Sequence, residues 1–242
     1  MIHAKDSKGT FYSLIKKNKT PIVFIHGVGL NSTIWKSQIN YFNNTTLVYD
    51  ILGHGKTNLN KSKISFSEFS VQLLNLIDDL NFEKIHLVGF SIGSLIARNF
   101  ATNYNNRLSS LILLCSAFKR TREQQQIVND RFELTKKSKT LSKQALKRWF
   151  SDDYLEKNPE TYKDICSILD QNNMENFLKA YELFVNHKDD ENFSKISTKT
   201  LIMTGENDIG STPDMSNNLS KEIANSKVKI ISKGKHLCGI EC

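Results

Sequence analysis

The pentapeptide Gly89-Phe-Ser-Ile-Gly93 has the pattern G-x-S-x-G and continues the apolar run IHLV. In this pattern a serine lies on a sharp turn between a strand and a helix, where its hydroxyl projects above the edge of the sheet. Its neighbours must be small because the helix and the strand pass close together there. The run SLIA that follows is apolar enough to begin a buried helix. Ser91 is therefore a candidate nucleophile.

A serine hydroxyl is a poor nucleophile at neutral pH and needs a base, which an acidic group orients. A serine on this kind of turn is followed along the chain by the acid and then by a histidine. Of the six histidines, four precede Ser91, and His187 precedes any plausible acid. His236 remains, in the loop GKHLCG directly after the apolar run VKIIS. We therefore expect His236 to be the base.

The acid is expected at a strand end between these two residues, and the stretch LIMTGENDIGSTP offers three carboxylates. Asp208 lies three residues past Gly205, where a loop can carry it toward His236. Glu206 is the alternative, and Asp214 lies further along. Some enzymes of this kind place the acid one strand earlier, but here that strand end reads CSAF and has no carboxylate. Asp208 is the expected acid.

Acyl transfer also needs hydrogen-bond donors for the developing oxyanion, and removing one such donor costs about 3 kcal/mol. The backbone N–H of Ile92, directly after the nucleophile, is one expected donor. The other is expected in the loop HGVGL after the apolar run PIVFI, where two glycines let the backbone bend toward a pocket. Val28 is the expected donor there. Taken alone, the segment is equally typical of a glycine-rich turn.

The stretch YDILGHGKT, residues 49–57, ends like a phosphate-binding loop. Such a loop has the pattern G-x-x-x-x-G-K-[ST], with a helix that starts at the lysine. Here the first position is Asp50, and the polar run NLNKSK follows in place of a helix. The next helix start is the capping box Ser65-x-x-Glu68. A nucleotide site is therefore disfavoured, and no cofactor is expected.

The elements that must hold these residues alternate between short apolar runs and helical patterns. PIVFIHG, TTLVYD, KIHLVGF and LSSLILLCSA are typical of buried strands, and KTLIMTG and SKVKIIS of two more. The fold class expected is α/β, with a doubly wound, mostly parallel sheet. Between these two groups the sequence shows four helix-like segments, residues 122–134, 141–150, 158–170 and 174–185. The third begins with Asn158 as N-cap and Pro159 at the first helical position. We expect a core of residues 1–119 and 193–242 and an inserted helical cap of residues 120–192.

Composition and charge narrow the class of protein. The chain has 242 residues, 39% hydrophobic and 24% charged, with no apolar run of membrane-spanning length and no signal-peptide pattern at its start. We therefore expect a cytoplasmic protein without a membrane partner. The net charge of +8 would permit a polyanion, but the lysines are spread widely and no nucleic-acid partner is expected. No metal-ligand spacing and no disulfide pattern is formed by the four cysteines Cys115, Cys166, Cys238 and Cys242.

Together, HGVGLNSTIW, DILGHGKT, VGFSIGS, GENDIGSTP and GKH resemble the α/β-hydrolase superfamily in order and spacing, over nearly the whole chain. DILGHGKT then corresponds to the superfamily's D-x-x-G-x-G-x-[ST] turn, in which Lys56 binds no phosphate. Within the superfamily, ALKRWFSDDYLEKNPE and the HGVG loop with Trp35 are most similar to 3-oxoadipate enol-lactonases and related small esterases. The resemblance implies a serine hydrolase that cleaves a carboxylic ester or lactone of a small substrate through an acyl-enzyme.

The expected cap carries the basic residues Lys143, Lys147 and Arg148, which are compatible with an anionic substrate. Arg148 and Trp149 are the expected substrate-binding residues. The alternative is an ordinary solvated helix face, because a lysine-rich stretch alone does not show which side chains face a pocket.

Other activities of the superfamily stay open to different degrees. Dehalogenases and epoxide hydrolases need an aspartate at position 91, so they are disfavoured. Carbon–carbon bond hydrolases and hydroxynitrile lyases keep the serine and are not excluded. A sensing protein with little turnover, built on a hydrolase scaffold, is an alternative of another class.

The sequence ends six residues after His236, whereas members of the superfamily usually continue with a helix that covers the last strand. Without such a helix, apolar sheet surface is expected to stay exposed, where a second copy of the chain could bind and form a homodimer.

Overall fold

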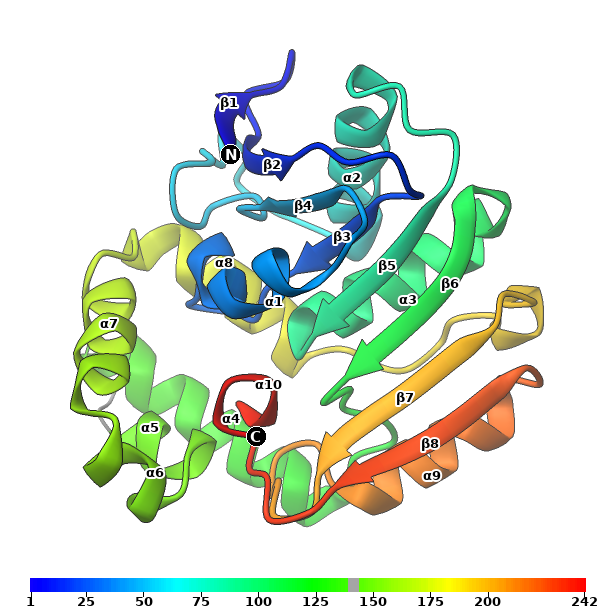
Figure 1. Ribbon diagram of the computed structural model, residues 1–242. Helices are drawn as coiled ribbons and strands as arrows, with labels where there is room; N and C mark the ends of the chain where they lie inside the picture. Colours follow the sequence, from blue (N-terminus) through cyan, green and yellow to red (C-terminus); the bar gives the residue numbers. More distant parts are fainter. Residues whose placement is uncertain (139–143) are drawn as a thin grey trace.

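The computed structural model describes residues 1–138 and 144–242, which are built around one eight-stranded sheet (Figure 1). The strands are β1 (Ile2–Lys5), β2 (Phe11–Ile15), β3 (Ile22–Ile25), β4 (Thr46–Tyr49), β5 (Ile85–Phe90), β6 (Leu108–Leu114), β7 (Thr200–Gly205) and β8 (Ser226–Ile231). Their order across the sheet is β1-β2-β4-β3-β5-β6-β7-β8. From β4 to β8 every pairing is parallel, while β1 and β2 pair antiparallel. The predicted mostly parallel sheet is confirmed.

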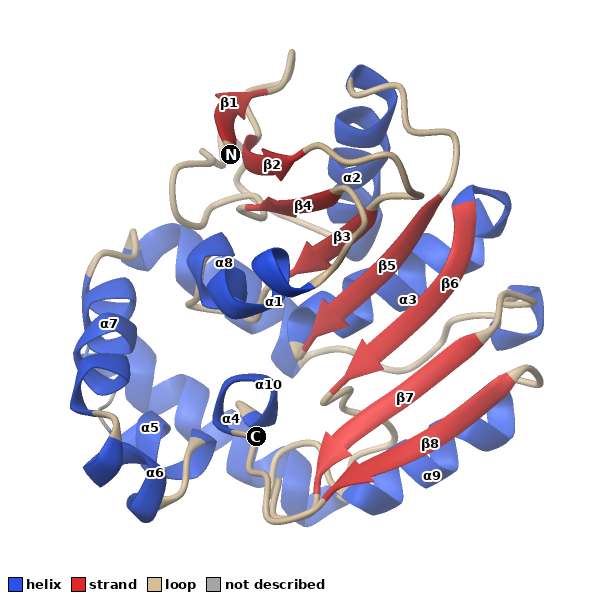
Figure 2. Cartoon of the chain, in the orientation of Figure 1, coloured by secondary structure: helices blue, strands red, loops and turns tan. Residues whose placement is uncertain are grey.

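Helices cover both faces of the sheet, which is why every side chain of β3 and of β4 is buried. α2 (Phe66–Asp79), α3 (Ile92–Tyr104) and α9 (Pro213–Glu222) pack on one face, around a core that includes Leu87, Phe100 and Leu219 (Figure 2). η1 (Ser32–Trp35) and α1 (Lys36–Tyr41) lie on the other face, where the rings of Trp35 and Phe90 meet edge to face. Two shorter 3-10 turns complete this part, η2 (Asn105–Arg107) and η3 (Phe193–Lys195).

The helices between β6 and β7 gather beyond the carboxyl ends of the parallel strands (Figure 1). They are α4 (Arg122–Ser138), α5 (Gln144–Trp149), α6 (Asp152–Lys157), α7 (Pro159–Asp170) and α8 (Met174–Val185). The four predicted segments match α4, α5, α7 and α8, although residues 141–143 of the second segment lie outside the described residues. The helix α6 is an addition. Division of the chain into a core and a cap at residues 120 and 192 stays a prediction.

Two local expectations have different outcomes. The capping box at the start of α2 is present, with the Ser65 hydroxyl accepting from the Glu68 N–H and the Glu68 carboxylate accepting from the Ser65 N–H. Asn158 precedes α7, but its side chain does not cap that helix. Its amide instead donates to the Tyr154 carbonyl and closes the end of α6. The predicted N-cap position of Asn158 and the first helical position of Pro159 are therefore confirmed, but the Asn158 amide bonds the preceding helix and gives α7 no side-chain cap.

The turn after β4 is held by one buried carboxylate. Asp50 accepts hydrogen bonds from the N–H groups of Ser32 and Lys56, each at 2.8 Å. Gly55 has a φ of 53°, and a Cβ there would lie 2.2 Å from a carboxylate oxygen of Asp50. Only glycine meets both conditions, since an L side chain rarely adopts this φ and would also displace the carboxylate. No helix starts at Lys56, whose ammonium lies over the Phe11 ring. This is the geometry of a structural turn.

One face of the sheet is only partly covered at β7 and β8. Lys227 and Lys229 are exposed there, beside the partly buried Leu201 and Met203 of β7. Some apolar surface is thus accessible, and the edge itself is basic. A homodimer through this face stays a prediction. Within the described ranges, we find no helix with both the length and the apolar character needed to cross a membrane.

Candidate active site

Ser91 lies on the turn from β5 into α3, with a φ of 56° that L residues rarely adopt. Its N–H donates to the Leu114 carbonyl, and its own carbonyl accepts from Ser94. A Cβ on Gly93 would lie 2.6 Å from two carbonyl oxygens of the β3 end, those of Ile25 and His26. The small residue therefore lets α3 start against the sheet and raises Ser91 to its edge.

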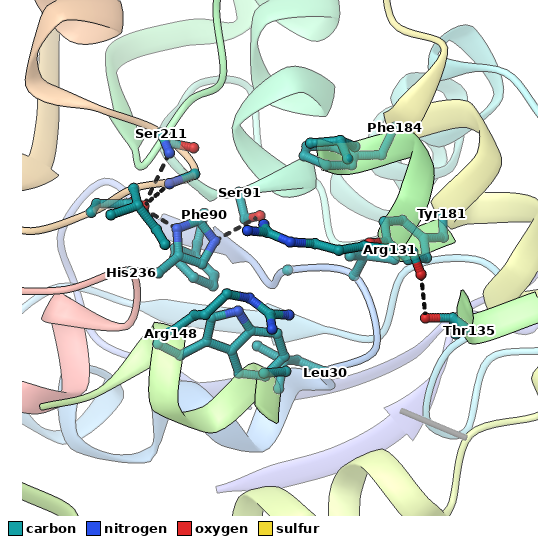
Figure 3. A pocket seen from close by; sticks show the side chains of 18 of the residues that line it. Leu30, Phe90, Ser91, Arg131, Thr135, Arg148, Tyr181, Phe184, Ser211 and His236 are labelled. Atoms are coloured by element: carbon teal, nitrogen blue, oxygen red, sulfur yellow. Dashed lines mark hydrogen bonds and ion pairs between the residues drawn. The ribbon is translucent and has the colours of Figure 1, made fainter. Parts of the chain in front are cut away.

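His236 and Asp208 lie beside this serine in one connected set of hydrogen bonds (Figure 3). His236 Nε2 is 3.2 Å from Ser91 Oγ, and His236 Nδ1 is 2.6 Å from Asp208 Oδ2. Because a carboxylate only accepts, the proton of the neutral ring belongs on Nδ1, which leaves Nε2 to accept from the serine hydroxyl. Three loops far apart in the sequence thus bring an alcohol, an imidazole and a carboxylate together.

Asp208 is fixed by more than the imidazole. Its Oδ1 accepts from the N–H groups of Gly210 and Ser211, at 2.8 and 3.0 Å. Burial by itself would raise the pKa of this carboxyl, but the charge of His236 and these hydrogen bonds together hold the pKa below its usual range. Glu206, the alternative acid, instead accepts from Ser232 and from the Lys233 N–H. Asp214 is exposed in the first turn of α9.

The expected oxyanion loop follows β3 and lines the same cavity through Gly27 and Val28. Its Gly29 has a φ of 75°, and the Gly29 carbonyl accepts from the side chain of Asn172 at 2.7 Å. Ile92 is the first residue of α3, so its N–H is among those that an α-helix leaves without an internal partner. Both backbone segments border Ser91.

The cavity in front of Ser91 has a volume of about 140 Å³. Cavities of this size accept a molecule about as large as benzene. One side comes from the sheet loops that carry Ser91, Asp208 and His236. The opposite side comes from the helices between β6 and β7, and is mostly apolar and aromatic: Val128, Leu134, Ala145, Trp149, Phe177, Tyr181 and Phe184.

Two arginines supply positive charge to this cavity. Arg131 of α4 reaches across it with its guanidinium group toward Ser91, and Arg148 of α5 lies on the other side, near His236 (Figure 3). Burial lowers the pKa of Arg148, and the nearby charge of Arg131 lowers it further. Trp149 also lines the cavity, and its carbonyl accepts from the Leu237 N–H.

The sequence profile of a family described as alpha/beta hydrolase fold matches residues 20–241. The chain belongs to this family.

Several proteins resemble this α/β hydrolase over most of its length. The (E)-2-((N-methylformamido)methylene)succinate hydrolase of Acinetobacter baylyi is 26% identical over 91% of the chain and 84% of that protein. The 3-oxoadipate enol-lactonase 2 of the same organism is 21% identical over 98% and 90%. Among solved structures, the enol-lactonase of Burkholderia xenovorans aligns with a TM-score of 0.82 at 21% identity, over 99% of this chain and 94% of that one. The predicted resemblance to enol-lactonases is confirmed.

The basic residues expected in the cap of this α/β hydrolase differ in whether they line the cavity. Arg148 lines the cavity as expected, whereas Lys147 is exposed and does not line it. Lys143 lies outside the described residues. Arg131 was not expected to line the cavity, although helical spacing gives a signal for it. It shares one face of α4 with Val128 and Thr135, which also line the cavity.

Two groups of described residues have ligand atoms close enough for a metal ion. The first combines Cys115 with His236 and Asp208, whose facing atoms already bond each other at 2.6 Å. The second is His187 with Asp189 and Glu191, and both carboxylates there pair with the buried Arg98. Because an arginine already supplies the cation, this second group gives no support for a metal site.

Proposed function

We propose that the protein is a serine hydrolase that cleaves a small carboxylic ester or lactone through an acyl-enzyme. The observation that carries this proposal is the connected set of hydrogen bonds from Ser91 through His236 to Asp208, at 3.2 and 2.6 Å. The small cavity and the resemblance to enol-lactonases support it. Simple binding would require neither an oriented imidazole nor a strained serine at the cavity wall.

In the proposed reaction, His236 Nε2 takes the Ser91 proton as Ser91 Oγ attacks the acyl carbon. The Val28 and Ile92 N–H groups stabilise the oxyanion, and Asp208 stabilises the imidazolium. His236 then gives its proton to the leaving oxygen, which leaves an acyl-enzyme. A water molecule, deprotonated by His236, attacks the acyl carbon and releases the acid and Ser91.

The Ser91→Ala variant tests the reaction. With a panel of short esters and lactones, we expect kcat to fall by about 10⁴ or more, because among the described residues the hydroxyl that bonds His236 Nε2 is that of Ser91. Ser110→Ala is the matched control and is expected to leave kcat unchanged, since Ser110 lies on β6 and bonds His86 of β5. A fluorophosphonate should label the wild type at Ser91. Turnover retained in the Ser91→Ala protein would contradict the proposal.

We further propose that the substrate carries a carboxylate beside the scissile group. Arg131 and Arg148 bring two positive charges to a partly apolar cavity, and each lowers the free-energy cost of binding an anion there. Among the described residues that line the cavity, Asp208 is the one acidic residue, and it is already bonded to His236. Two of the similar proteins are named for a succinate and an oxoadipate derivative.

Arg131→Ala and Arg148→Ala test this substrate class. For carboxylated esters, we expect kcat/KM to fall by about tenfold or more in each variant, as for the loss of a charged hydrogen bond. For neutral esters of equal length, kcat/KM should change little. Lys147→Ala is the control, because Lys147 is exposed one position before Arg148. Equal losses for both kinds of ester would contradict selection for a carboxylate.

A further inference from the structure

Two buried cysteines meet directly behind the catalytic candidates. Cys115 follows β6, and Cys238 begins the short helix α10 (Cys238–Glu241). Their sulfur atoms lie 3.7 Å apart, and both thiols are free. The two side chains are almost fully buried, with 0% and 1% exposure. The fold therefore holds together two thiols that are 123 positions apart in the sequence.

These thiols contact the proposed triad. The Cys115 thiol lies 3.2 Å from the carbonyl oxygen of His236 and donates to it. The Cys115 sulfur also lies within 4.8 Å of the facing atoms of Asp208 and His236. Cys238 follows His236 by two positions. A change in the distance between the two sulfurs would therefore act on the loop that carries His236.

We propose that Cys115 and Cys238 form an oxidisable dithiol, a modification site whose disulfide disables His236. The proposal that these two thiols pair rests on their geometry and does not depend on the proposed function. Its effect on hydrolysis rests on the proposed function.

The oxidant that the proposal requires is a peroxide. One thiol loses its proton, and its sulfur attacks a peroxide oxygen, which breaks the O–O bond and gives a sulfenic acid and water. The second sulfur attacks the sulfenic sulfur, the S–S bond forms, and hydroxide leaves with the second thiol proton as water. In total, two thiols lose two electrons and two protons, and hydrogen peroxide is reduced to two molecules of water. Cys115 is buried and does not line the cavity, but its sulfur lies within 4.8 Å of ligand atoms of His236 and Asp208, which do, so we expect the oxidant to approach it from that side.

Closing the disulfide requires movement, because bonded sulfur atoms are about 2.05 Å apart and these lie 3.7 Å apart. Cys115 is held in place more firmly than Cys238. Its N–H donates to the Met203 carbonyl, and the Thr204 hydroxyl bonds its sulfur. Cys238 starts a helix of four residues, so the displacement should fall on the segment from His236 to Cys238. The hydrogen bond from the Cys115 thiol to the His236 carbonyl is lost at the same time.

A displaced His236 no longer meets Ser91 in the geometry that proton transfer needs. Errors of about 1 Å in the placement of catalytic groups lower turnover by as much as 10². We therefore expect the oxidised protein to hydrolyse esters at least tenfold more slowly than the reduced protein. Burial raises the pKa of the Cys115 thiol, and the neighbouring Cys238 and the charge of Asp208 raise it further. Because the thiolate is the reacting form, oxidation should be faster at alkaline pH.

The test treats the wild-type protein with hydrogen peroxide, maps its disulfides by peptide mass spectrometry and measures ester hydrolysis before and after addition of dithiothreitol. We expect a Cys115–Cys238 disulfide, at least a tenfold loss of kcat and recovery on reduction. Cys238→Ala should lose no activity on treatment, relative to its own untreated rate. Cys166→Ala is the matched control and should respond as the wild type does, because Cys166 is a partly buried free thiol on α7 and is not a member of this pair.

Three results would overturn the proposal. The first is a Cys115–Cys238 disulfide with unchanged turnover. The second is a loss of kcat in treated Cys238→Ala as large as that in the treated wild type. The third is oxidation of Cys166 or the exposed Cys242 with no Cys115–Cys238 disulfide. Mapping and recovery in the wild type need no variant, so poor folding of Cys238→Ala would not prevent a decision. If the reduced protein hydrolyses no ester, the proposed function fails separately. The disulfide and its effect on fluorophosphonate labelling of Ser91 would then test the dithiol.

Discussion

At the scale of single residues, the orientation of Asp208 matters as much as its charge. Two backbone N–H groups fix Oδ1, so only Oδ2 faces His236. The carboxylate thereby selects the imidazole tautomer that can accept a proton from Ser91. Glu206 lies two residues away in the same loop, but its carboxylate bonds Lys233 and Ser232 instead.

This difference predicts opposite outcomes for two amide substitutions. In Asp208→Asn, the side-chain oxygen should keep accepting from Gly210 and Ser211, which turns the NH₂ group toward His236 Nδ1. The ring must then carry its proton on Nε2 and cannot accept from Ser91, so kcat should fall by about 10⁴. Glu206→Gln should leave kcat within about twofold of the wild type, because that side chain does not contact His236. Ester hydrolysis measured for both variants checks this, and equal losses would contradict the choice of Asp208.

At the scale of elements, a side chain in the turn between α7 and α8 is hydrogen-bonded to the expected oxyanion loop. The Asn172 amide donates to the Gly29 carbonyl and also to carbonyls at the end of α7. The helices above the cavity are therefore tied to the backbone next to Val28. This contact links residues 143 positions apart and could not be read from either segment alone.

We expect Asn172→Ala to loosen the oxyanion loop. The kcat for ester hydrolysis should fall by about tenfold, with KM little changed, because the donors act mainly on the transition state. Gln171→Ala is the control, since the Gln171 side chain bonds only Ser167 on its own helix in the described structure. A change in KM with kcat unaffected would assign Asn172 to substrate binding instead.

The turn after β4 gives a second prediction at this scale, for stability. Gly55→Ala combines an unfavourable φ with a Cβ placed 2.2 Å from Asp50, so the free energy of unfolding should fall by about 2 kcal/mol or more. Gly9→Ala is the matched control, because Gly9 also has a positive φ but has open space around its Cα. It should cost only the backbone strain, about 1 kcal/mol. Denaturant unfolding measures both, and equal losses would show that the clash with Asp50 contributes nothing.

At the scale of the whole molecule, a buried charge cluster ties α3 to the segment that returns from α8. The fully buried Arg98 pairs with Asp189 and Glu191, each at 2.7 Å, and Phe118 and Phe193 pack against its guanidinium group. His187 lies against both carboxylates. Such a cluster is weak evidence for high stability, but loss of one member leaves the others buried and uncompensated.

This cluster predicts how stability depends on pH. Burial lowers the pKa of His187, but the bonds to Asp189 and Glu191 outweigh it and raise the pKa above its ordinary value of about 6.5. Its stabilising contribution is therefore complete below about pH 6.5 and is lost as the pH rises through the raised value. The same contacts lower the pKa values of Asp189 and Glu191, despite their burial. Their contributions are present above about pH 4.5 and are lost as the pH falls through the lowered values.

Thermal unfolding from pH 2 to 9 checks this. The melting temperature should be highest between about pH 4.5 and 6.5 and fall on both sides. In His187→Gln the alkaline fall should be smaller, because the titrating cation is absent. His3→Gln is the control, since His3 is exposed at the N-terminal strand and bonds Ser13. If the melting temperature of His187→Gln falls equally at alkaline pH, groups other than His187 cause the fall.

The sequence predicted the parallel strands from β3 to β8 and missed the N-terminal hairpin of β1 and β2. Uninterrupted apolar runs identify buried parallel strands, whereas polar residues interrupt the apolar residues of β1 and β2. These two strands join the sheet through the antiparallel pairing of β2 with β4. The helix α6 was missed for a similar reason, since its six residues carry no buried stripe.

What the sequence determined by itself is the positions of Ser91, Asp208 and His236, each in a loop at the end of an apolar strand. Parallel strands bring their carboxyl ends to one edge, so local patterns sufficed to place these three side chains together, and their catalytic roles stay a prediction. Helical spacing places Arg131 on one face of α4 with Val128 and Thr135, but only the tertiary structure decided that this face lines the cavity. The tertiary structure also decided that Asn172 holds the expected oxyanion loop and that Cys115 meets Cys238. Those contacts join segments whose separation is set by how helices pack over the sheet, and no periodicity along the chain records that packing.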